Sequence, residues 1–178
     1  MIDPDPMRKL LPLVILLAAG VLHAAPAKRA FQTEFLTNLQ DVEKKIEQLA
    51  EAVPTEKYSW RPGPGVRSIS EVYTHIAGSN YFLVTFLGKQ APQDMPRDIE
   101  RITDKAKVLA ELRRSFDHVR AAATASHDAD LEKPVNMFGT STTQRGVFVT
   151  ILNHLHEHLG QSIAYARMNG VAPPWSKE

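Results

Sequence analysis

Apolar residues recur at alternating spacings of three and four residues in four separate stretches of the chain. This spacing is typical of the buried face of an amphipathic helix. In the first stretch, 31–52, five residues fall on one such face: Phe35, Leu39, Val42, Ile46 and Leu49. Pro54 follows, and proline does not continue a helix. The pattern therefore predicts a first helix over 31–52.

The second predicted helix begins after Ser68 and runs to Leu87. Ser68 and Glu71 form a capping box, in which the hydroxyl and the carboxylate satisfy free N–H groups at a helix start. Gly88 is placed to end this helix. The segment before it, 60–66, is rich in proline and glycine and is incompatible with helix or central strand.

Two further helices complete the pattern. The third is predicted over 103–124 and the fourth over 143–169, where Gly170 and two prolines provide the stop. Between them, 126–141 is polar and is broken by a proline and a glycine, so a long loop is predicted. No segment alternates between apolar and polar residues over a useful strand length. We therefore expect an all-α fold, a four-helix bundle.

The first 27 residues are predicted to be a cleaved signal peptide. They have a basic start at 7–9, an apolar run at 10–22 and an Ala-x-Ala cleavage site at 25–27. The apolar run is shorter than the roughly 20 residues of a spanning helix. Translation begins at the first methionine or the second, and an uncleaved membrane anchor is the alternative. Cleavage leaves 28–178 as one exported domain, periplasmic or extracellular, with no stable membrane span.

The amino-acid composition excludes several classes of protein and of metal site for this domain. The 178-residue chain has no cysteine, which excludes disulfide scaffolds, cysteine-ligated zinc, iron–sulfur clusters and thiol nucleophiles. Its 21 basic and 20 acidic residues leave a net charge of +1, which argues against nucleic acid as a partner. Any metal must therefore be held by nitrogen and oxygen.

Three of the seven histidines lie on helix flanks that are able to face one another. His154 and His158 are four residues apart, which puts both imidazoles on one side of the fourth predicted helix. His75 lies on a flank of the second. If these two helices pack together, three imidazoles converge in a site for zinc, nickel or another divalent cation, with one or more positions left for water. The alternative is a set of half-buried, hydrogen-bonded imidazoles.

These residues resemble the DinB/YfiT-like superfamily, and the resemblance covers nearly all of 28–178. It is carried by Trp-Arg-Pro-Gly-Pro-Gly at 60–65, Ser68, Ile69, His75, His-x-x-x-His-Leu-Gly-Gln at 154–161, Tyr165, Ala166, Arg167, Pro173, Pro174 and Trp175. The resemblance implies a DinB-like four-helix bundle with a divalent metal, and it assigns the ligand roles to His75, His154 and His158.

The resemblance also implies enzyme classes. Related thiol S-transferases use a metal to activate a low-molecular-weight thiol, and maleylpyruvate isomerases form another branch of the superfamily. A metal-bound water would instead serve as the nucleophile of a hydrolase. We expect a metal-dependent hydrolase or transferase acting on a small molecule. Predicted export argues against the transferase, because such thiols belong mainly to the cytosol. The alternative is a non-catalytic metal-binding or ligand-sensing module. Homodimerisation is compatible with the sequence but not indicated by it.

Residues near the predicted ligands have two readings each. Gln161 orients a ligand or a bound water, or else lies at the edge of the bundle. Glu71 reaches the metal or an imidazole, although its capping role is favoured. Three aromatic residues are expected to pack against the bundle and not to bind substrate: Trp60, Tyr81 and Trp175. Two arginines, Arg61 and Arg67, are expected either to bind an anionic substrate or to face solvent.

Overall fold

Four long helices form where the apolar spacing predicts them. In the computed structural model, which describes residues 30–176, they are α1 (Ala30–Ala52), α2 (Ile69–Leu83), α3 (Lys105–Ala125) and α4 (Gln144–Met168). The last turn of the second predicted helix is instead a 3₁₀ helix, η2 (Val84–Leu87). The predicted signal peptide over 1–27 lies outside the described residues, and the domain start at 28 stays a prediction.

The helix ends are set by the predicted local signals. The amide of Glu71 donates to Ser68 Oγ at 3.3 Å, and the amide of Ser68 donates to Glu71 Oε2 at 2.7 Å, which completes the capping box of α2. The side chain of Asp104 caps α3 by accepting one hydrogen bond, at 2.9 Å, from an amide in the first turn. Gly88 and Gly170 end their segments with φ of 76° and 74°, a conformation that favours glycine.

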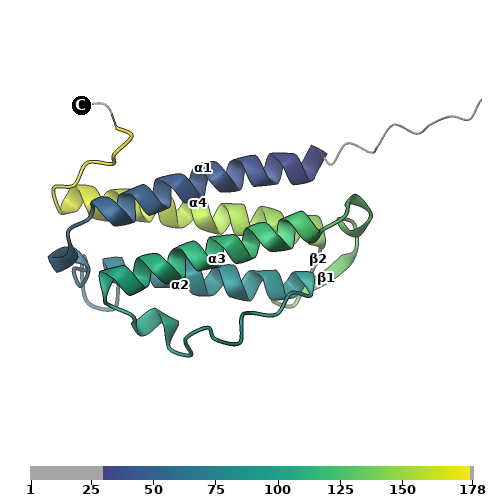
Figure 1. Ribbon diagram of the computed structural model, residues 1–178, viewed down its shortest axis with the longest axis horizontal. Coiled ribbons are helices and arrows are strands. Elements are labelled where there is room, and N and C mark those ends of the chain that lie inside the picture. Colours follow the sequence, from purple (N-terminus) through teal and green to yellow (C-terminus); the bar gives the residue numbers. More distant parts are fainter. Residues whose placement is uncertain (1–29, 177–178) are drawn as a thin grey trace, which may run out of the picture.

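The bundle consists of two parallel pairs of helices. Figure 1 shows α1 and α4 running in one direction and α2 and α3 in the other. α1 and α2 each contact both α3 and α4, so α1 and α2 lie on one diagonal of the bundle. Because α2 and α3 are parallel, the chain must return along the bundle between them. This crossover, 88–104, carries the short helix η3 (Ile99–Arg101), which contacts α2.

The segment predicted as a long loop contains a β-hairpin. β1 (Pro134–Met137) pairs antiparallel with β2 (Thr140–Thr143). Phe138 and Gly139 form the turn, with φ of 54° and 81°, as a two-residue type I′ turn requires. The side chain of Asn136 accepts a hydrogen bond from the Gly139 amide at 3.0 Å. The prediction of no strands was wrong, because two four-residue polar strands show too little alternation.

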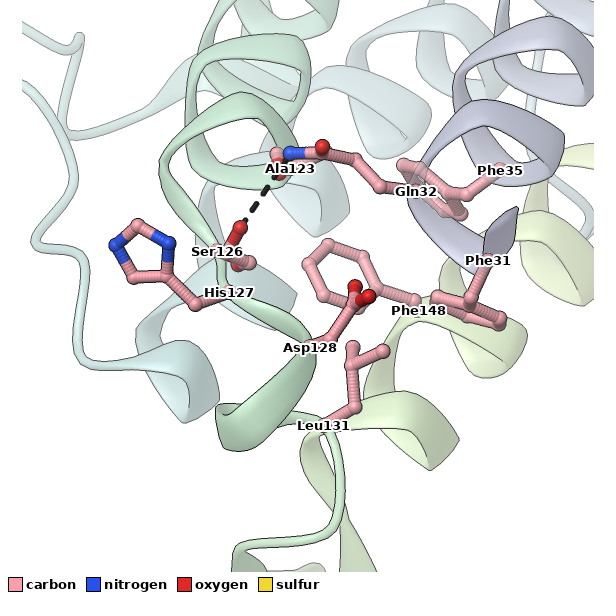
Figure 2. Close-up of a pocket in the computed structure, with 9 residues that line it drawn as sticks. All are labelled: Phe31, Gln32, Phe35, Ala123, Ser126, His127, Asp128, Leu131 and Phe148. Carbon is pink, nitrogen blue, oxygen red and sulfur yellow. Dashed lines mark hydrogen bonds between the residues drawn. The ribbon is translucent and has the colours of Figure 1, made fainter. Parts of the chain in front are cut away.

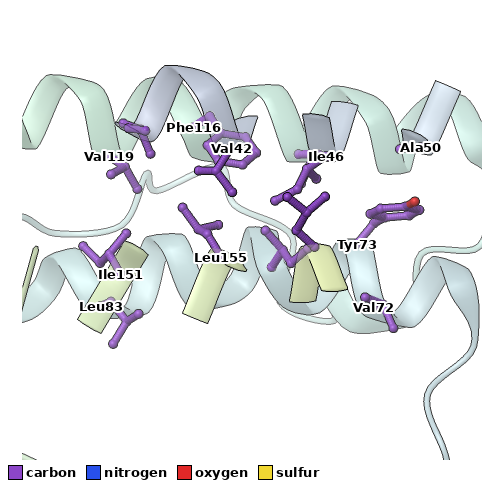
Figure 3. Close-up of a cluster of buried hydrophobic side chains, with 14 of the residues drawn as sticks. Val42, Ile46, Ala50, Val72, Tyr73, Leu83, Phe116, Val119, Ile151 and Leu155 are labelled. Atoms are coloured by element: carbon purple, nitrogen blue, oxygen red, sulfur yellow. The ribbon is translucent and has the colours of Figure 1, made fainter. Parts of the chain in front are cut away.

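The core lies along the axis of the bundle and is built from all four helices (Figure 3). Its fully buried members include most of the first predicted stripe and residues of the other helices, among them Leu39, Val42, Ile46, Leu112, Phe116, Val119, Ile151 and Leu155. A helix buried along one stripe leaves its flanks free for polar groups, and the candidate site uses those flanks. Within 30–176, no helix has the length and apolar character needed to cross a bilayer.

Candidate metal centre

The three histidines predicted as ligands meet between α2 and α4. His75 comes from α2, while His154 and His158 come from successive turns of α4. Nε2 of His75 and Nε2 of His154 are 3.2 Å apart, and one nitrogen from each of the three rings lies within 4.8 Å of the others. Two imidazole ligands of a tetrahedral zinc ion are about 3.4 Å apart, given a Zn–N distance of about 2.1 Å. The spacing of His75 and His154 therefore suits two ligands of one ion, and the third ring lies beside them.

Glu100 holds the imidazole of His75 in place. A carboxylate accepts hydrogen bonds, so Nδ1 of His75 donates to Glu100 Oε1, at 2.8 Å. In a neutral ring this makes Nε2 of His75 the unprotonated nitrogen, and that atom faces His154. A carboxylate behind a histidine ligand fixes the ring and raises its basicity. The other carboxylate oxygen of Glu100 is 3.9 Å from the guanidinium of Arg67.

Gln161 orients His158 in the same manner. The amide nitrogen of Gln161 donates to the hydroxyl of Tyr165 at 3.0 Å, which turns its oxygen toward the imidazole. Gln161 Oε1 then accepts from Nδ1 of His158 at 2.8 Å. Nε2 of His158 is left free for a metal. Of the two readings of Gln161, the structure shows the orienting one.

His154 is held neutral by its surroundings. Burial, followed by the imidazoles of His158 and His75 and the charge of Arg67, lowers the pKa of His154 to about 4. Burial also lowers the pKa of His158. Neutral imidazole is the form that binds a metal, so both rings are in that form at pH 7. Nδ1 of His154 is buried and has no hydrogen-bond partner among the described residues.

The other residues singled out near the site have structural roles. Trp60 packs edge-on against Tyr165, with ring centroids 5.4 Å apart. Arg61 donates to Glu71 at 3.0 Å, so both side chains belong to the cap of α2. The predicted packing roles of the remaining aromatic residues are confirmed: Tyr81 is buried, and Trp175 packs against the core.

The remaining histidines of the described chain lie apart from this centre. His118 packs against Tyr81, with ring centroids 5.5 Å apart, and Nδ1 of His156 is 2.8 Å from the carbonyl oxygen of Leu152. His127 belongs to a different pocket. Within residues 30–176, the triad is the one group of three residues whose ligand atoms converge.

That different pocket is apolar and lies where α1 and α4 begin and α3 ends (Figure 2). Its walls are mainly the side chains of Phe31, Phe35, Leu131 and Phe148. Figure 2 shows the ring of His127 turned away from Phe148. His127 and one aspartate line the pocket without a third potential ligand, so this pocket is not a candidate metal site.

Sequence reasoning missed Glu100. The residue lies in the crossover between two predicted helices, 25 positions after His75, in a segment without helical periodicity. A carboxylate in a linker gives no local signal of its partner. The topology places it, because the crossover runs back along α2.

Comparisons with known proteins agree with this fold. A family model described as the DinB superfamily matches residues 38–162. A DinB-like protein from Bacillus cereus aligns with a TM-score of 0.71 and 18% identity over 82% of this chain and 97% of that chain. A DinB-like protein from Bacillus subtilis aligns with a TM-score of 0.65 and 19% identity over 82% and 99%.

A third solved structure carries a functional description. YfiT from Bacillus subtilis, described as a probable metal-dependent hydrolase with an unusual four-helix bundle topology, aligns with a TM-score of 0.63 and 17% identity. The alignment covers 79% of this chain and 89% of that chain. At these identities the likeness establishes the shared fold. No curated protein matches the sequence.

Proposed function

Because the chain belongs to the DinB superfamily, we propose that it is a metal-dependent enzyme that hydrolyses a small molecule at His75, His154 and His158. One observation carries the proposal. Two of these rings are held from behind, His75 by Glu100 and His158 by Gln161, so that their free Nε2 atoms are available to one ion. The description of YfiT as a probable metal-dependent hydrolase supports the reaction class.

The donor set suits a catalytic cation. Three neutral imidazoles favour zinc, nickel or a similar borderline ion over magnesium or calcium, which prefer oxygen ligands. Structural zinc sites use four protein ligands, whereas catalytic sites use three and keep one position for water or substrate. The triad supplies three, and the described chain brings no fourth potential ligand into the group.

The surrounding residues prepare this site for hydrolysis. A bound divalent cation would supply a Lewis acid and a water of lowered pKa. Glu100 and Gln161 keep Nδ1 of His75 and His158 protonated, so that Nε2 remains the donor atom. The charge of Arg67 acts on His154 and His158 and would favour an anionic group of the substrate.

We also propose that the enzyme acts outside the cytoplasm, on the basis of the predicted signal peptide. Export favours water over a low-molecular-weight thiol as the nucleophile, and hence a hydrolase over a transferase. Amino-terminal sequencing of the protein from the extracytoplasmic fraction should begin at Lys28. Recovery of the intact amino terminus from the cytoplasm would contradict this part of the proposal.

Metal analysis of the purified protein tests the site. After incubation with Zn²⁺ or Ni²⁺ and removal of the excess, the wild type should retain one ion per chain, and His154→Ala should retain far less. His156→Ala is the matched control, because this exposed histidine on α4 bonds to its own helix. A wild type that retains no ion would overturn the proposal.

Turnover tests the reaction. A panel of small esters, amides and phosphate esters should include one that the loaded wild type hydrolyses and that His75→Ala does not. A protein that retains the ion but hydrolyses none of them would favour the binding or sensing module.

A further inference from the structure

A strip of side chains leads from the three histidines toward the hairpin end of the bundle. At 100° per residue, Ser79 and Phe82 lie within about 40° of His75 around α2. Phe82 is therefore on the same flank as His75, about 10.5 Å farther along the axis. On α4, Thr150 precedes His154 by one turn. Ser79 and Thr150 are both partly exposed. The strip begins at the metal centre and ends at Phe82.

An aromatic patch lies at the far end of this strip, formed by Phe82, Phe86 and Phe138. The ring centroids of Phe82 and Phe86 are 5.4 Å apart, and that of Phe138 is 5.9 Å from the first and 5.4 Å from the second. Phe82 is 50% exposed and Phe138 is 67% exposed. Phe82 comes from α2, Phe86 from η2 and Phe138 from the turn of the hairpin, whose strand β1 contacts η2.

Phe138 has an unfavourable backbone conformation in the hairpin turn. It occupies the first turn position of the hairpin with φ of 54°, a conformation in which a bulky residue is rare. Asparagine or glycine would satisfy this turn more easily. Two thirds of the side chain is exposed, so burial compensates for little of the strain. Strained residues of this kind cluster at functional sites.

We propose that the aromatic patch binds the apolar tail of the substrate whose polar head lies at the three histidines. The inference rests on the proposed function. It identifies the substrate class as a small molecule with a metal-coordinating acyl or similar head and a ring-bearing apolar tail. The helical geometry separates the two groups by about 10 Å.

The size of the patch favours a small molecule over a protein partner. Phe82 and Phe138 together expose about 200–250 Å² of side chain, taking about 200 Å² for a whole phenylalanine. A stable dimer requires roughly 800 Å² from each partner. One aromatic ring placed against the patch would use most of the area available.

Hydroxamates test the inference, because their head binds zinc whatever the tail. Acetohydroxamate and 6-phenylhexanohydroxamate differ in a five-methylene linker and a phenyl ring. The extended linker and ring together reach about 10 Å from the head, close to the rise of two helical turns. Calorimetric titration of the Zn²⁺-loaded full-length protein should show the phenyl probe binding at least about tenfold more tightly. The double variant Phe82→Ser with Phe138→Ser should reduce that advantage to about twofold or less. Met168→Ser, which alters an exposed apolar residue at the other end of α4, should preserve it.

The readouts separate the two proposals. Zinc content of the double variant should equal that of the wild type, and its thermal unfolding should show a folded protein, because both substituted residues are at least half exposed. Equal affinities for the two hydroxamates in zinc-loaded wild type would overturn the tail site and leave the metal site standing. Absence of bound zinc would overturn both. A wild-type dimer in sedimentation that the double variant converts to monomer would assign the patch to self-association and overturn the inference.

Discussion

Nδ1 of His75 donates a 2.8 Å hydrogen bond to Oε1 of Glu100, although the two residues lie 25 positions apart on different elements. The bond exists because α2 and α3 are parallel. The chain must return along the bundle between them, and η3 brings Glu100 alongside α2. The bundle topology thereby adds a carboxylate to a site whose ligands all come from long helices.

Removal of this carboxylate should weaken metal binding. Loss of a hydrogen-bond partner behind a ligand typically costs about 10–100-fold in metal affinity. We expect that loss for Glu100→Ala and a smaller one for Glu100→Gln, whose amide oxygen still accepts the bond. Competition with a chromophoric chelator measures the affinity. Glu56→Ala, at an exposed carboxylate on η1 (Thr55–Lys57), is the control. Wild-type affinity in Glu100→Ala would show that the bond does not support the ligand.

The metal-free protein should lose stability as the pH falls below neutral. The pKa of His154 is about 4 in the folded chain, against about 6.5 when unfolded. Between these values the unfolded chain binds more protons, so the free energy of unfolding decreases as the pH falls from about 6.5 to about 4. Above pH 6.5 this contribution is fully present.

Denaturant unfolding of chelator-treated protein at a series of pH values measures this loss. His154→Gln has no group to titrate at this position, so its stability should decline less steeply over the same range. Parallel pH profiles for the wild type and His154→Gln would contradict the depressed pKa.

Two substitutions of Phe138 should separate backbone strain from ring packing. Phe138→Asn and Phe138→Ala both remove the ring from Phe82 and Phe86, but asparagine tolerates the left-handed conformation that alanine resists. We expect the asparagine variant to be more stable than the alanine variant by about 1 kcal/mol. Thermal or denaturant unfolding decides between them. Equal stabilities would mean that the turn holds no strain.

The helices could be predicted because their signals are local. Apolar spacing predicted the buried face of each helix, and the pairing of Ser68 with Glu71 predicted where α2 begins. The four-residue spacing of His154 and His158 likewise sufficed to place both imidazoles on one side of α4. Each of these relationships spans about one helical turn, so neighbouring residues decide it.

The hairpin shows where local signals fail. Its strands are four residues long and mostly polar, and a phenylalanine occupies a turn position that favours asparagine or glycine. Pairing between the strands and contact with η2 organise this segment. Neither effect leaves a periodic pattern in the sequence.

By itself, the sequence determined four amphipathic helices, the stripe each one buries and the adjacency of His154 and His158, because these depend on residues within one or two turns. Only the tertiary structure decided that His75 faces that pair, that Glu100 stands behind His75 and that Phe138 joins Phe82. These contacts depend on the packing of α2 against α4 and on the direction of α3. Both properties arise from the burial of the whole core, to which every helix contributes.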